Sequence, residues 1–441
     1  MSYSKALAEL QRVTGRPVRI ALVGAGQMGR GFVSQVNRIK GMDVVCIADV
    51  DLERATEAFI GTGHPKPATA DDVDQATRLI NEGHGVAIRN ADMLPQLPVD
   101  VVVEATGVPE VGAKVMLANL LGGHDVATLN VETDVTVGLV LRRIAEQAGL
   151  VYTVCRGDEP AEAKILHDFA VDLGFEVVAA GKGKNNPLNQ WATPDQLMAE
   201  AKAKHMNPKM LTSFVDGSKA MIEMAALANT TGLEVSKRGM YGPPSSVATL
   251  QETFALQQDG GVLDRPGVVD YCTGDVAPGV FVIARTDEPY VLEEMNYLKM
   301  GKGPYYSFYR PYHLASIEAH LSVMELVIDR KPTLVAEHWT AEVAARSKRE
   351  LVPGDKIDGI GGSTVAGLID KAQDFRNDGL VPLGVLSGAT VRRNVKAGDP
   401  LTYDDVEIDE SQTIVQLRRL QDQFLASGLW LAEPHNPVYN F

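Results

Sequence analysis

The sequence predicts an α/β fold in which a doubly wound parallel sheet forms the first third of the chain. An apolar run beginning at Val18 leads into Gly24, Gly26 and Gly29, and a helical pattern follows. A second apolar run then ends in Asp49, and strands and helices keep alternating to about residue 155. Continuous Val, Ile and Leu runs are typical of strands buried on both faces. We therefore expect an open parallel sheet with helices on both sides.

The three glycines match the GxGxxG pattern of a Rossmann-type dinucleotide-binding turn, in the strand and helix context that this pattern requires. Gly24 would permit the tight turn, Gly26 would let a pyrophosphate approach the backbone, and Gly29 would let the helix pack closely. Gln27 and Met28 share this turn and are expected to contact the cofactor, because helix-start N–H groups face phosphates. The alternative is a glycine-rich loop that only turns the chain.

Asp49 closes the second predicted strand, where an acid takes the ribose hydroxyls of a dinucleotide. On physical grounds this acid favours NAD over its phosphorylated form. Arg54 lies one helical turn later and would meet a 2′-phosphate, so the choice between NAD and NADP stays open.

The remaining elements of this region follow in order. Helices are expected over 52–60, 71–81, 109–121 and 135–148, and strands over 86–89, 99–107, 150–155 and within HDVATLNVETD. Ligands of such sheets bind at the carboxyl ends of the strands. Four residues at those ends are expected to line the cofactor crevice: Thr106, Gly107, Asn130 and Glu132. Loop capping is the alternative there, with Thr133 or Asp134 as the N-cap of the next helix.

Length and composition indicate an ordinary globular protein of two or three domains: 441 residues, 45% hydrophobic and 22% charged. The formal net charge of −15 argues against nucleic acid as a partner. Three scattered cysteines, Cys46, Cys155 and Cys272, form no metal spacing, which favours small buried side chains in a reduced, cytoplasmic protein. We expect no membrane segment, because no long apolar run occurs and the N-terminus has a polar amphipathic pattern.

Beyond Cys155 the pattern changes, and Asp158 and Glu159 open a predicted helix directly after the last strand of the sheet. Two acids at a helix N-terminus are often only favourable capping. The functional interpretation is that they bind a divalent cation or position a substrate over the crevice.

A cationic, asparagine-rich loop follows the next predicted strand, GFEVVAAGKGKNNPLNQW. Lys182, Lys184, Asn185 and Asn186 would suit an anionic substrate. A solvated turn is the alternative, because Gly and Asn favour turns.

A helix within 213–233 places Asp216, Lys219 and Glu223 at i, i+3 and i+7, on one face. These charges are costly to bury unless they are paired. They would suit a proton relay or metal ligand together with a cation that polarises a carbonyl. An exposed Lys219–Glu223 ion pair is the alternative, and Asn229 is either a substrate ligand or a helix cap.

Residues 270–298 are expected to form strands, and four tyrosines then surround Arg310 and His313 ahead of an amphipathic helix. Arg310 and His313 are candidates for a substrate phosphate or carboxylate. Aromatic clusters more commonly form a core or a subunit interface.

The tail contains an internal repeat in which SKRELVPGDKID, beginning at Ser347, recurs as VRRNVKAGDPLT, beginning at Val391. Each copy is expected to form a strand, a Gly-Asp turn and another strand. Three domains follow from the whole pattern: a dinucleotide-binding domain over 1–155, a catalytic and oligomerisation domain of α+β type over 156–340, and a small β-rich domain over 341–441.

The cofactor half with VDVVVEATG, together with Asp216 and Lys219, resembles homoserine dehydrogenase, and the tail repeat resembles the SAF domain. The combination with GKGKNNP, VDGSKAMIEMA and YRPYHL is most similar to the 1-deoxy-D-xylulose 5-phosphate reductoisomerase-like (DRL) family, over essentially the full chain. This sequence departs from the family pattern in two ways. The spacing of its acids and lysines differs, and Asp49 is an acid that does not suit NADPH.

This resemblance implies an NADPH-dependent reductoisomerase that makes 2-C-methyl-D-erythritol 4-phosphate for isoprenoid synthesis, with Mg²⁺ or Mn²⁺ as a possible cofactor. Asp158 and Glu159 would then hold the metal, Lys219 would polarise the aldehyde, and Lys182, Lys184 and His313 would hold the phosphate. A phosphorylated sugar as substrate and a homo-oligomeric cytoplasmic enzyme are implied as well.

Two alternatives stay open. One is an oxidoreductase similar to homoserine dehydrogenase that acts on another hydroxy acid or sugar derivative without isomerisation or metal. The other is a cofactor-sensing regulatory protein without turnover, for which only the appended tail domain argues.

Overall fold

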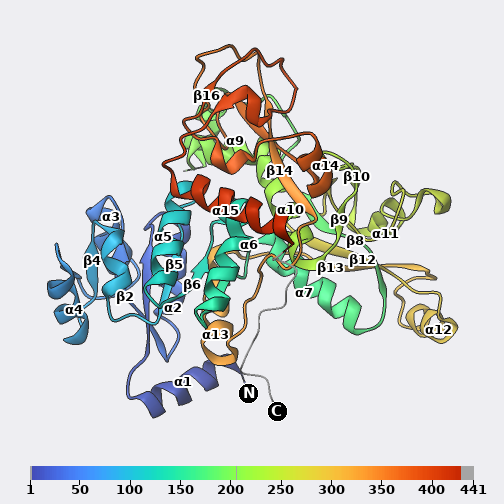
Figure 1. Cartoon of the computed structure of the whole chain (residues 1–441). Coiled ribbons are helices and arrows are strands. Elements are labelled where there is room, and N and C mark those ends of the chain that lie inside the picture. Colours follow the sequence, from blue (N-terminus) through green and yellow to red (C-terminus); the bar gives the residue numbers. More distant parts are fainter. Residues whose placement is uncertain (1, 205, 429–441) are drawn as a thin grey trace. The chain divides into compact units, whose positions relative to one another are not determined.

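The computed structural model describes residues 2–204 and 206–428, and its elements are labelled in Figure 1. The chain groups into two compact units, which we describe separately. The first contains residues 2–157, 314–335 and 410–428, and the second contains residues 158–313 and 336–409. The three-domain division at residues 155 and 340 stays a prediction, and residues 1 and 429–441 of its outer domains lie outside the described residues.

A seven-stranded sheet forms the centre of the first unit, in the order β3-β4-β2-β1-β5-β6-β7, and every pair in it is parallel. Its strands are β1 (Val18–Val23), β2 (Met42–Ala48), β3 (Ala68–Thr69), β4 (Val86–Ile88), β5 (Val101–Glu104), β6 (Asp125–Thr128) and β7 (Tyr152–Val154). The predicted α/β class with a doubly wound parallel sheet is confirmed.

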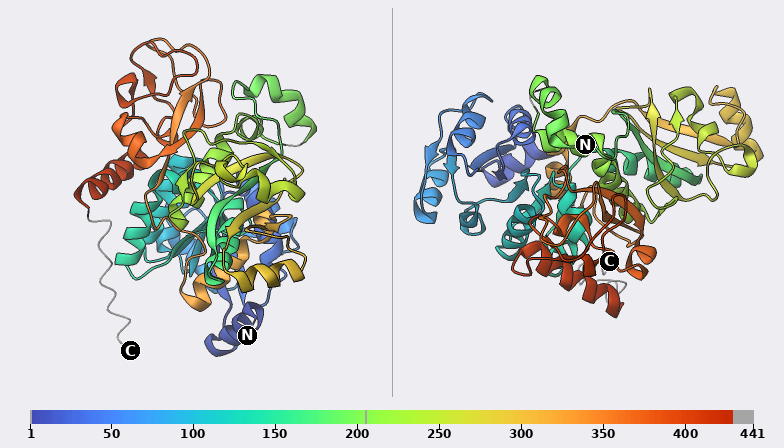
Figure 2. Two further views of the ribbon diagram at one scale, coloured as in Figure 1. Left: turned by 90° about the vertical axis from the view of Figure 1, so that its right-hand side faces the viewer. Right: turned by 90° about the horizontal axis from the view of Figure 1, so that it is seen from above.

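The helices of the first unit connect and cover these strands. They are α1 (Tyr3–Thr14), α2 (Gln27–Val36), α3 (Leu52–Ile60), α4 (Val73–Asn81), α5 (Pro109–Leu121), α6 (Val131–Gln147), α13 (Ala319–Asp329) and α15 (Thr413–Ser427), with short 3₁₀ helices at Ala91–Gln96 and Ala315–Ile317. α13 joins the buried apolar core that β1 and α2 share. α15, red in Figures 1 and 2, packs on α5 and α6 from the far end of the sequence. Sequence-distant segments therefore complete this unit.

The strand order reverses direction at β1, which pairs with β2 on one side and with β5 on the other. Val23, the last residue of β1, lies beside Ala48 of β2 and Glu104 of β5. The loops that begin at Gly24, Asp49 and Ala105 therefore leave one edge of the sheet together, at the switch point where ligands of such sheets bind.

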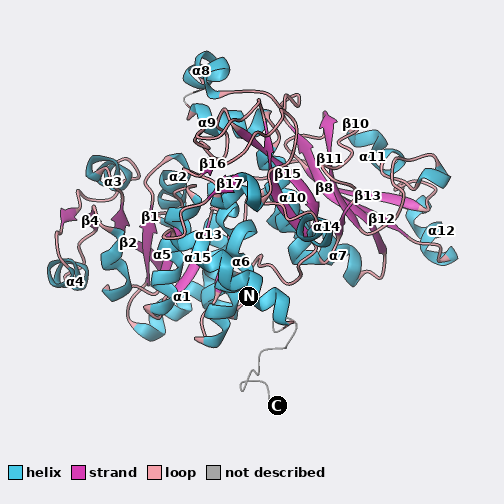
Figure 3. Cartoon of the chain, turned by 45° about the horizontal axis from the view of Figure 1, so that its top comes forward, coloured by secondary structure: helices cyan, strands magenta, loops and turns pink. Residues whose placement is uncertain are grey.

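A mixed sheet in the order β10-β11-β8-β12-β13 organises the second unit (Figure 3), and β9 pairs with β11. The strands are β8 (Glu176–Lys184), β9 (Glu234–Val235), β10 (Pro244–Ser245), β11 (Val268–Gly274), β12 (Val280–Arg285) and β13 (Tyr305–Arg310). The all-strand prediction for 270–298 is wrong at its end, where Pro289–Tyr297 forms α12. Pro289 at N1 of this helix is a start signal that the strand interpretation overlooked.

Two helices carry the polar residues of the second unit: α7 (Glu159–Asp172), which contacts β8 and β12, and α10 (Ser218–Thr231). α10 is buried on nearly its whole circumference, because it packs on α7, on β11 and on two tail strands. Any charge on α10 therefore needs a partner. The other helices are α8 (Pro194–Ala203), α9 (Pro208–Val215), α11 (Leu250–Thr253) and α14 (Ala372–Asn377), with 3₁₀ turns at Val247–Thr249, Gln257–Asp259, Leu383–Val385 and Tyr403–Asp405.

The tail forms two small antiparallel sheets, from β14 (Ala341–Ser347) with β15 (Val365–Lys371) and from β16 (Thr390–Val391) with β17 (Val406–Glu407). The two copies of the repeat pair with each other: Leu351 and Val395 exchange backbone hydrogen bonds of 2.9 and 3.0 Å. Both Gly-Asp turns are present, since Gly354 and Gly398 have φ of 96° and 92°. Across the described part of the chain, no helix combines the length and apolarity needed to cross a bilayer.

Candidate functional site

In the first unit, Gly24 and Gly29 have the turn and packing roles that their spacing predicts. Gly24 has φ of 97°, and a Cβ on Gly29 would lie 2.0 Å from the carbonyl oxygen of Gly24. Gly26 differs, because a Cβ there would meet nothing within 4 Å. Fold packing thus explains Gly24 and Gly29, whereas the space above Gly26 fits a bound pyrophosphate. Gln27 and Met28 form the first turn of α2 beside this space.

Asp49 binds the glycine loop directly. Its carboxylate accepts hydrogen bonds from the backbone N–H of Ala25 (2.7 Å) and of Asp51 (2.9 Å). A carboxylate has further lone pairs, so these bonds leave capacity for a ribose hydroxyl. Arg54 pairs with Asp51 at 3.3 Å on the surface.

The other predicted cofactor residues lie around a buried acid that sequence reasoning missed, Glu104. Its carboxylate accepts from the Thr106 backbone N–H (2.8 Å), from the Thr106 hydroxyl and from the Thr128 hydroxyl (3.0 Å). Burial raises the pKa of Glu104, although these donors oppose the shift. The signal was present, because Glu104 is the only charged residue inside VVVEATG.

Asn130 is the N-cap of α6, accepting from the Thr133 backbone N–H at 3.2 Å. The expectation that Thr133 or Asp134 caps this helix is therefore wrong, because the helix begins at Val131. Gly107 lies exposed in the loop after β5 with φ of 66°, and Glu132 lies in the first turn of α6. The structure brings all of these residues to the same strand ends.

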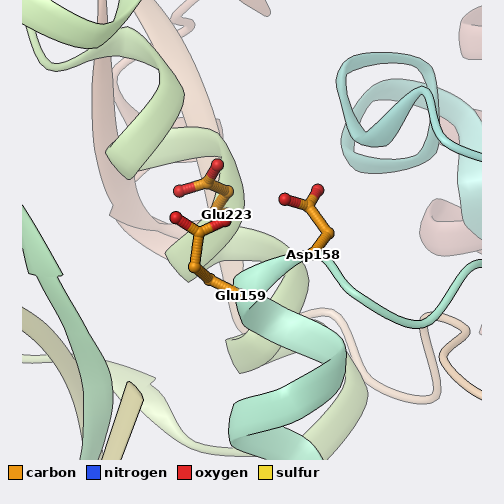
Figure 4. Close-up of side chains that lie close together, drawn as sticks. All are labelled: Asp158, Glu159 and Glu223. Atoms are coloured by element: carbon orange, nitrogen blue, oxygen red, sulfur yellow. The ribbon is translucent and has the colours of Figure 1, made fainter. Parts of the chain in front are cut away.

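In the second unit, a cluster of charged side chains joins the start of α7, the middle of α10 and the end of β8. Figure 4 shows its three carboxylates, with Glu159 and Glu223 close together and Asp158 at the helix start. Lys182 of β8 donates to Glu159 (2.5 Å) and to Glu223. All three of these side chains are at most 9% exposed.

Lys219 completes this cluster, one helical turn before Glu223. Its Nζ lies 3.7 Å from a carboxylate oxygen of Asp158 and 3.7 Å from one of Glu223. His313 Nε2 is 3.3 Å from Glu159, and Arg310 pairs with the buried Glu162 of α7. We call Asp158, Glu159, Lys182, Lys219 and Glu223 the charged cluster.

Burial and pairing distribute protons unevenly within the charged cluster. Burial raises the pKa of Glu223 to about 8, with the nearby Glu159 adding to the shift and Lys182 opposing it. Burial also raises the pKa of Asp158 to about 6, against the effect of Lys219. Burial acts in the same direction on Glu159, but Lys182 and His313 hold the pKa of Glu159 below its usual range. Burial and the neighbouring acids thus favour a proton on Glu223 more than on Glu159.

The donor set also fits a hard divalent cation by type. One ligand atom from each of Asp158, Glu159 and Glu223 lies within 4.8 Å of the others, and such ions prefer carboxylate oxygens. The Lys182 ammonium already bridges two of these carboxylates. A metal would therefore compete with Lys182 for them.

Two predicted site residues have structural contacts instead. Asp216 pairs at 2.6 Å with Lys348, which comes from the tail, and both side chains are at most 1% exposed. The Asn229 side chain accepts from the backbone N–H groups of Thr340 and Ala341 and donates to the Ala341 carbonyl, all at 3.0 Å. Asp216 and Asn229 thus join α10 to the tail, and neither belongs to the charged cluster.

The residues of the predicted cationic loop do not form one group in the structure. Lys182 lies in the charged cluster, whereas Lys184 donates to the Asn186 carbonyl at 2.6 Å, and Asn185 is exposed. Sequence reasoning missed Glu162 and Lys348. Glu162 lies at i+3 from Glu159, so helical spacing could have indicated it. No sequence pattern near Lys348 indicates that it pairs with Asp216.

The charged cluster lies within a segment of the chain that matches a known protein family. Residues 157–319 match a family model described as the catalytic domain of the oxidoreductase DRL. All five residues of the charged cluster fall within that range. The coarser part of the family expectation, an oxidoreductase-type catalytic segment, is thereby supported.

Other similarities are partial. The chain is 37% identical over 92 residues to glycosyl hydrolase family 109 protein 2 of Shewanella sp. (strain ANA-3), and the match spans 20% of this chain and only 17% of that relative. A probable dehydrogenase from Thermotoga maritima aligns over 71% of this chain and 90% of its own, with a TM-score of 0.40 and 14% identity. The NADPH complex of 1-deoxy-D-xylulose 5-phosphate reductoisomerase from Zymomonas mobilis aligns over 47% of this chain and 57% of its own, with a TM-score of 0.33 and 19% identity. Structural similarity at this level does not define a substrate.

Proposed function

We propose that this protein is an NAD(P)-dependent oxidoreductase that acts on the hydroxyl or carbonyl carbon of a small polar substrate. The observation that carries the proposal is the charged cluster, which lies within the segment matching an oxidoreductase catalytic domain. The open space above Gly26, beside Asp49, adds a fitting dinucleotide cradle in the first unit. A nicotinamide bound there would supply or accept the hydride.

The residues of the second unit would handle the proton. Lys219 would donate a hydrogen bond to the substrate oxygen and stabilise the negative charge that develops on it during reduction. Glu223 lies 3.7 Å from Lys219, and burial raises its pKa, so it would replace a proton that Lys219 gives up. Lys182 would keep Glu159 and Glu223 in place.

A reductoisomerase that makes 2-C-methyl-D-erythritol 4-phosphate is the second candidate. The observation in its favour is the carboxylate triad of Asp158, Glu159 and Glu223, which would hold a divalent cation on vicinal substrate oxygens. The bridging position of Lys182 favours the simpler oxidoreductase, because the Lys182 ammonium already pairs with Glu159 and Glu223.

One experiment separates the candidates. The purified protein is titrated with NADH and NADPH, and then assayed with 1-deoxy-D-xylulose 5-phosphate and with a panel of hydroxy acids and sugar derivatives, with and without a chelator. The proposal predicts turnover of a panel member that survives the chelator. Chelator-sensitive conversion of the deoxyxylulose phosphate would support the reductoisomerase, and cofactor binding without turnover on any substrate would support a sensing role.

A further inference from the structure

Lys182 is paired with two glutamates, which leaves it poorly placed to hold an anionic group of a substrate. A second group of cations lies where the loop after β8 meets the tail. We call Lys184, Arg346 and Lys348 the tail-side cations. They come from β8, from β14 and from the residue after β14.

Lys184 is buried, at 6% exposure, and lies two residues after Lys182 on β8, which places both side chains on the same face of the strand. Its Nζ donates to the Asn186 carbonyl at 2.6 Å and, within residues 2–204 and 206–428, forms no ion pair with a carboxylate. This ammonium is thus desolvated without a counter-ion.

Arg346 is only partly satisfied. One guanidinium nitrogen donates to Gln190, and the guanidinium lies 5.6 Å from the centre of the Trp191 ring. Its Nε is buried with no hydrogen-bond partner. Gln190 and Trp191 belong to the loop that follows Lys184, the last residue of β8, so Arg346 contacts the loop that Lys184 precedes.

The two acids whose charges act on Lys184 are Asp216 and Glu223, and each is already paired with another lysine. Asp216 pairs with Lys348, whose Nζ also donates to the carbonyls of Ala192 (2.8 Å) and Gly362 (2.7 Å). The Asp216 charge acts on both Lys184 and Arg346, opposing the effect of burial on their pKa values. Within the described residues, Lys184 and Arg346 therefore form no ion pair with a carboxylate of their own.

A partly buried cation without an ion-paired carboxylate is unfavourable unless a ligand supplies the counter-charge. Arginine and lysine together are the usual donors to phosphate and carboxylate oxygens. We propose that Lys184 and Arg346 form an anion subsite that holds a phosphate or carboxylate group of the substrate, and that the tail contributes to specificity through Arg346. The assignment of this anion to a substrate rests on the proposed oxidoreductase function.

Isothermal titration of the full chain with inorganic phosphate and, separately, with acetate tests the subsite. Arg346→Gln and Lys184→Gln are each expected to weaken binding of the preferred anion about tenfold or more, because each removes charge-assisted hydrogen bonds. Arg346→Lys should retain part of the affinity. The matched control is Arg349→Gln, which removes an arginine that is half exposed and paired with Asp355, and it should bind like the wild type.

Near-UV circular dichroism checks that each variant is folded, and Lys184→Gln together with Arg346→Lys carries the test if Arg346→Gln does not fold. Wild-type affinity in folded Lys184 and Arg346 variants, or no saturable binding of either anion by the wild type, overturns the subsite. A parallel titration with NADPH and NADH separates the two claims. Dinucleotide binding without anion binding defeats the subsite alone, whereas anion binding without dinucleotide binding defeats the proposed function alone.

Discussion

Lys182 and Lys219 belong to the same charged cluster but are held differently. Lys182 forms short hydrogen bonds to two glutamates, whereas the Lys219 Nζ lies 3.7 Å from its two carboxylate neighbours. Turning Lys182 toward a substrate oxygen would break its hydrogen bonds to both buried glutamates. This difference is why Lys219, rather than Lys182, is assigned to the chemistry.

Replacing Lys219 by Met should lower kcat by a factor of about 10² to 10³, the usual cost of losing one charge-stabilising donor. Dinucleotide affinity should stay within about twofold, because Lys219 lies outside the first unit. Steady-state kinetics and a cofactor titration measure both effects. Lys202→Met, an exposed lysine on α8, is the control. Wild-type kcat in the Lys219 variant would remove this residue from the mechanism.

Asp134 in the first unit gives a test of stability against pH. Burial raises the pKa of Asp134 from 3.8 to about 7, and the Tyr152 hydroxyl donates to it at 2.9 Å. The folded state therefore holds a proton that the unfolded state releases, so this residue lowers stability as pH rises from about 4 through 7. An asparagine at this position does not titrate, and its side-chain oxygen can still accept the hydrogen bond from the Tyr152 hydroxyl.

The stability of Asp134→Asn relative to the wild type should consequently increase between pH 4 and pH 8, by on the order of 4 kcal/mol. Denaturant midpoints at several pH values measure this change. Asp92→Asn, an exposed acid, should show little pH-dependent difference. A stability difference for Asp134→Asn that does not vary with pH would show that Asp134 is ionised in the fold.

At the scale of elements, two glycines of the turn are expected to have different roles, Gly29 in packing of the fold and Gly26 in binding of the dinucleotide. Gly29→Ala should lower the free energy of unfolding by about 2 kcal/mol, because its Cβ would meet the Gly24 carbonyl. Gly26→Ala should cost at most about 1 kcal/mol as an N-cap change, because its Cβ meets open space. Thermal denaturation of the two variants without ligand compares them. Equal destabilisation would contradict the assignment of Gly26 to ligand binding.

Elements with strong periodicity could be predicted from sequence, and elements defined by tertiary contacts could not. The predicted helices over 52–60 and 109–121 coincide with α3 and α5, because apolar spacing and Pro109 mark them locally. α12 was mistaken for a strand because its sequence, PYVLEEMNY, buries no residue and so carries no clear apolar face.

The residues of the candidate site also divide into those that local sequence patterns indicate and those that only tertiary contacts bring into place. Asp158, Glu159, Lys219 and Glu223 were identified because helical spacing and a helix start group them in sequence. Arg346 and Lys348 were not identified, because they lie on strand β14 and on the residue after it, more than a hundred residues beyond α10. The prediction of a catalytic role for Asp216 has the same cause, because no local sequence pattern indicates that Lys348 is its partner.

At the scale of the whole molecule, the tail is part of both units. β14 and β15 cover α10, and α15 packs on α5 and α6. A chain that ends at residue 340 should therefore be poorly soluble or melt at a markedly lower temperature than the full chain, because α10 and α6 lose apolar partners and Asp216 loses Lys348. Differential scanning calorimetry compares the two. An unchanged melting temperature would show that the tail is an independent appendage.

The central claim is that this chain uses a nicotinamide dinucleotide bound at the glycine turn of the first unit. Fluorescence titration of the wild type, Gly26→Val and Lys219→Met with NADH and NADPH tests it most directly. The wild type and Lys219→Met should bind at least one of the two with equal affinity, and Gly26→Val, though folded, should bind at least about tenfold more weakly. Wild-type affinity in Gly26→Val, or no binding of either dinucleotide by the wild type, would contradict the claim.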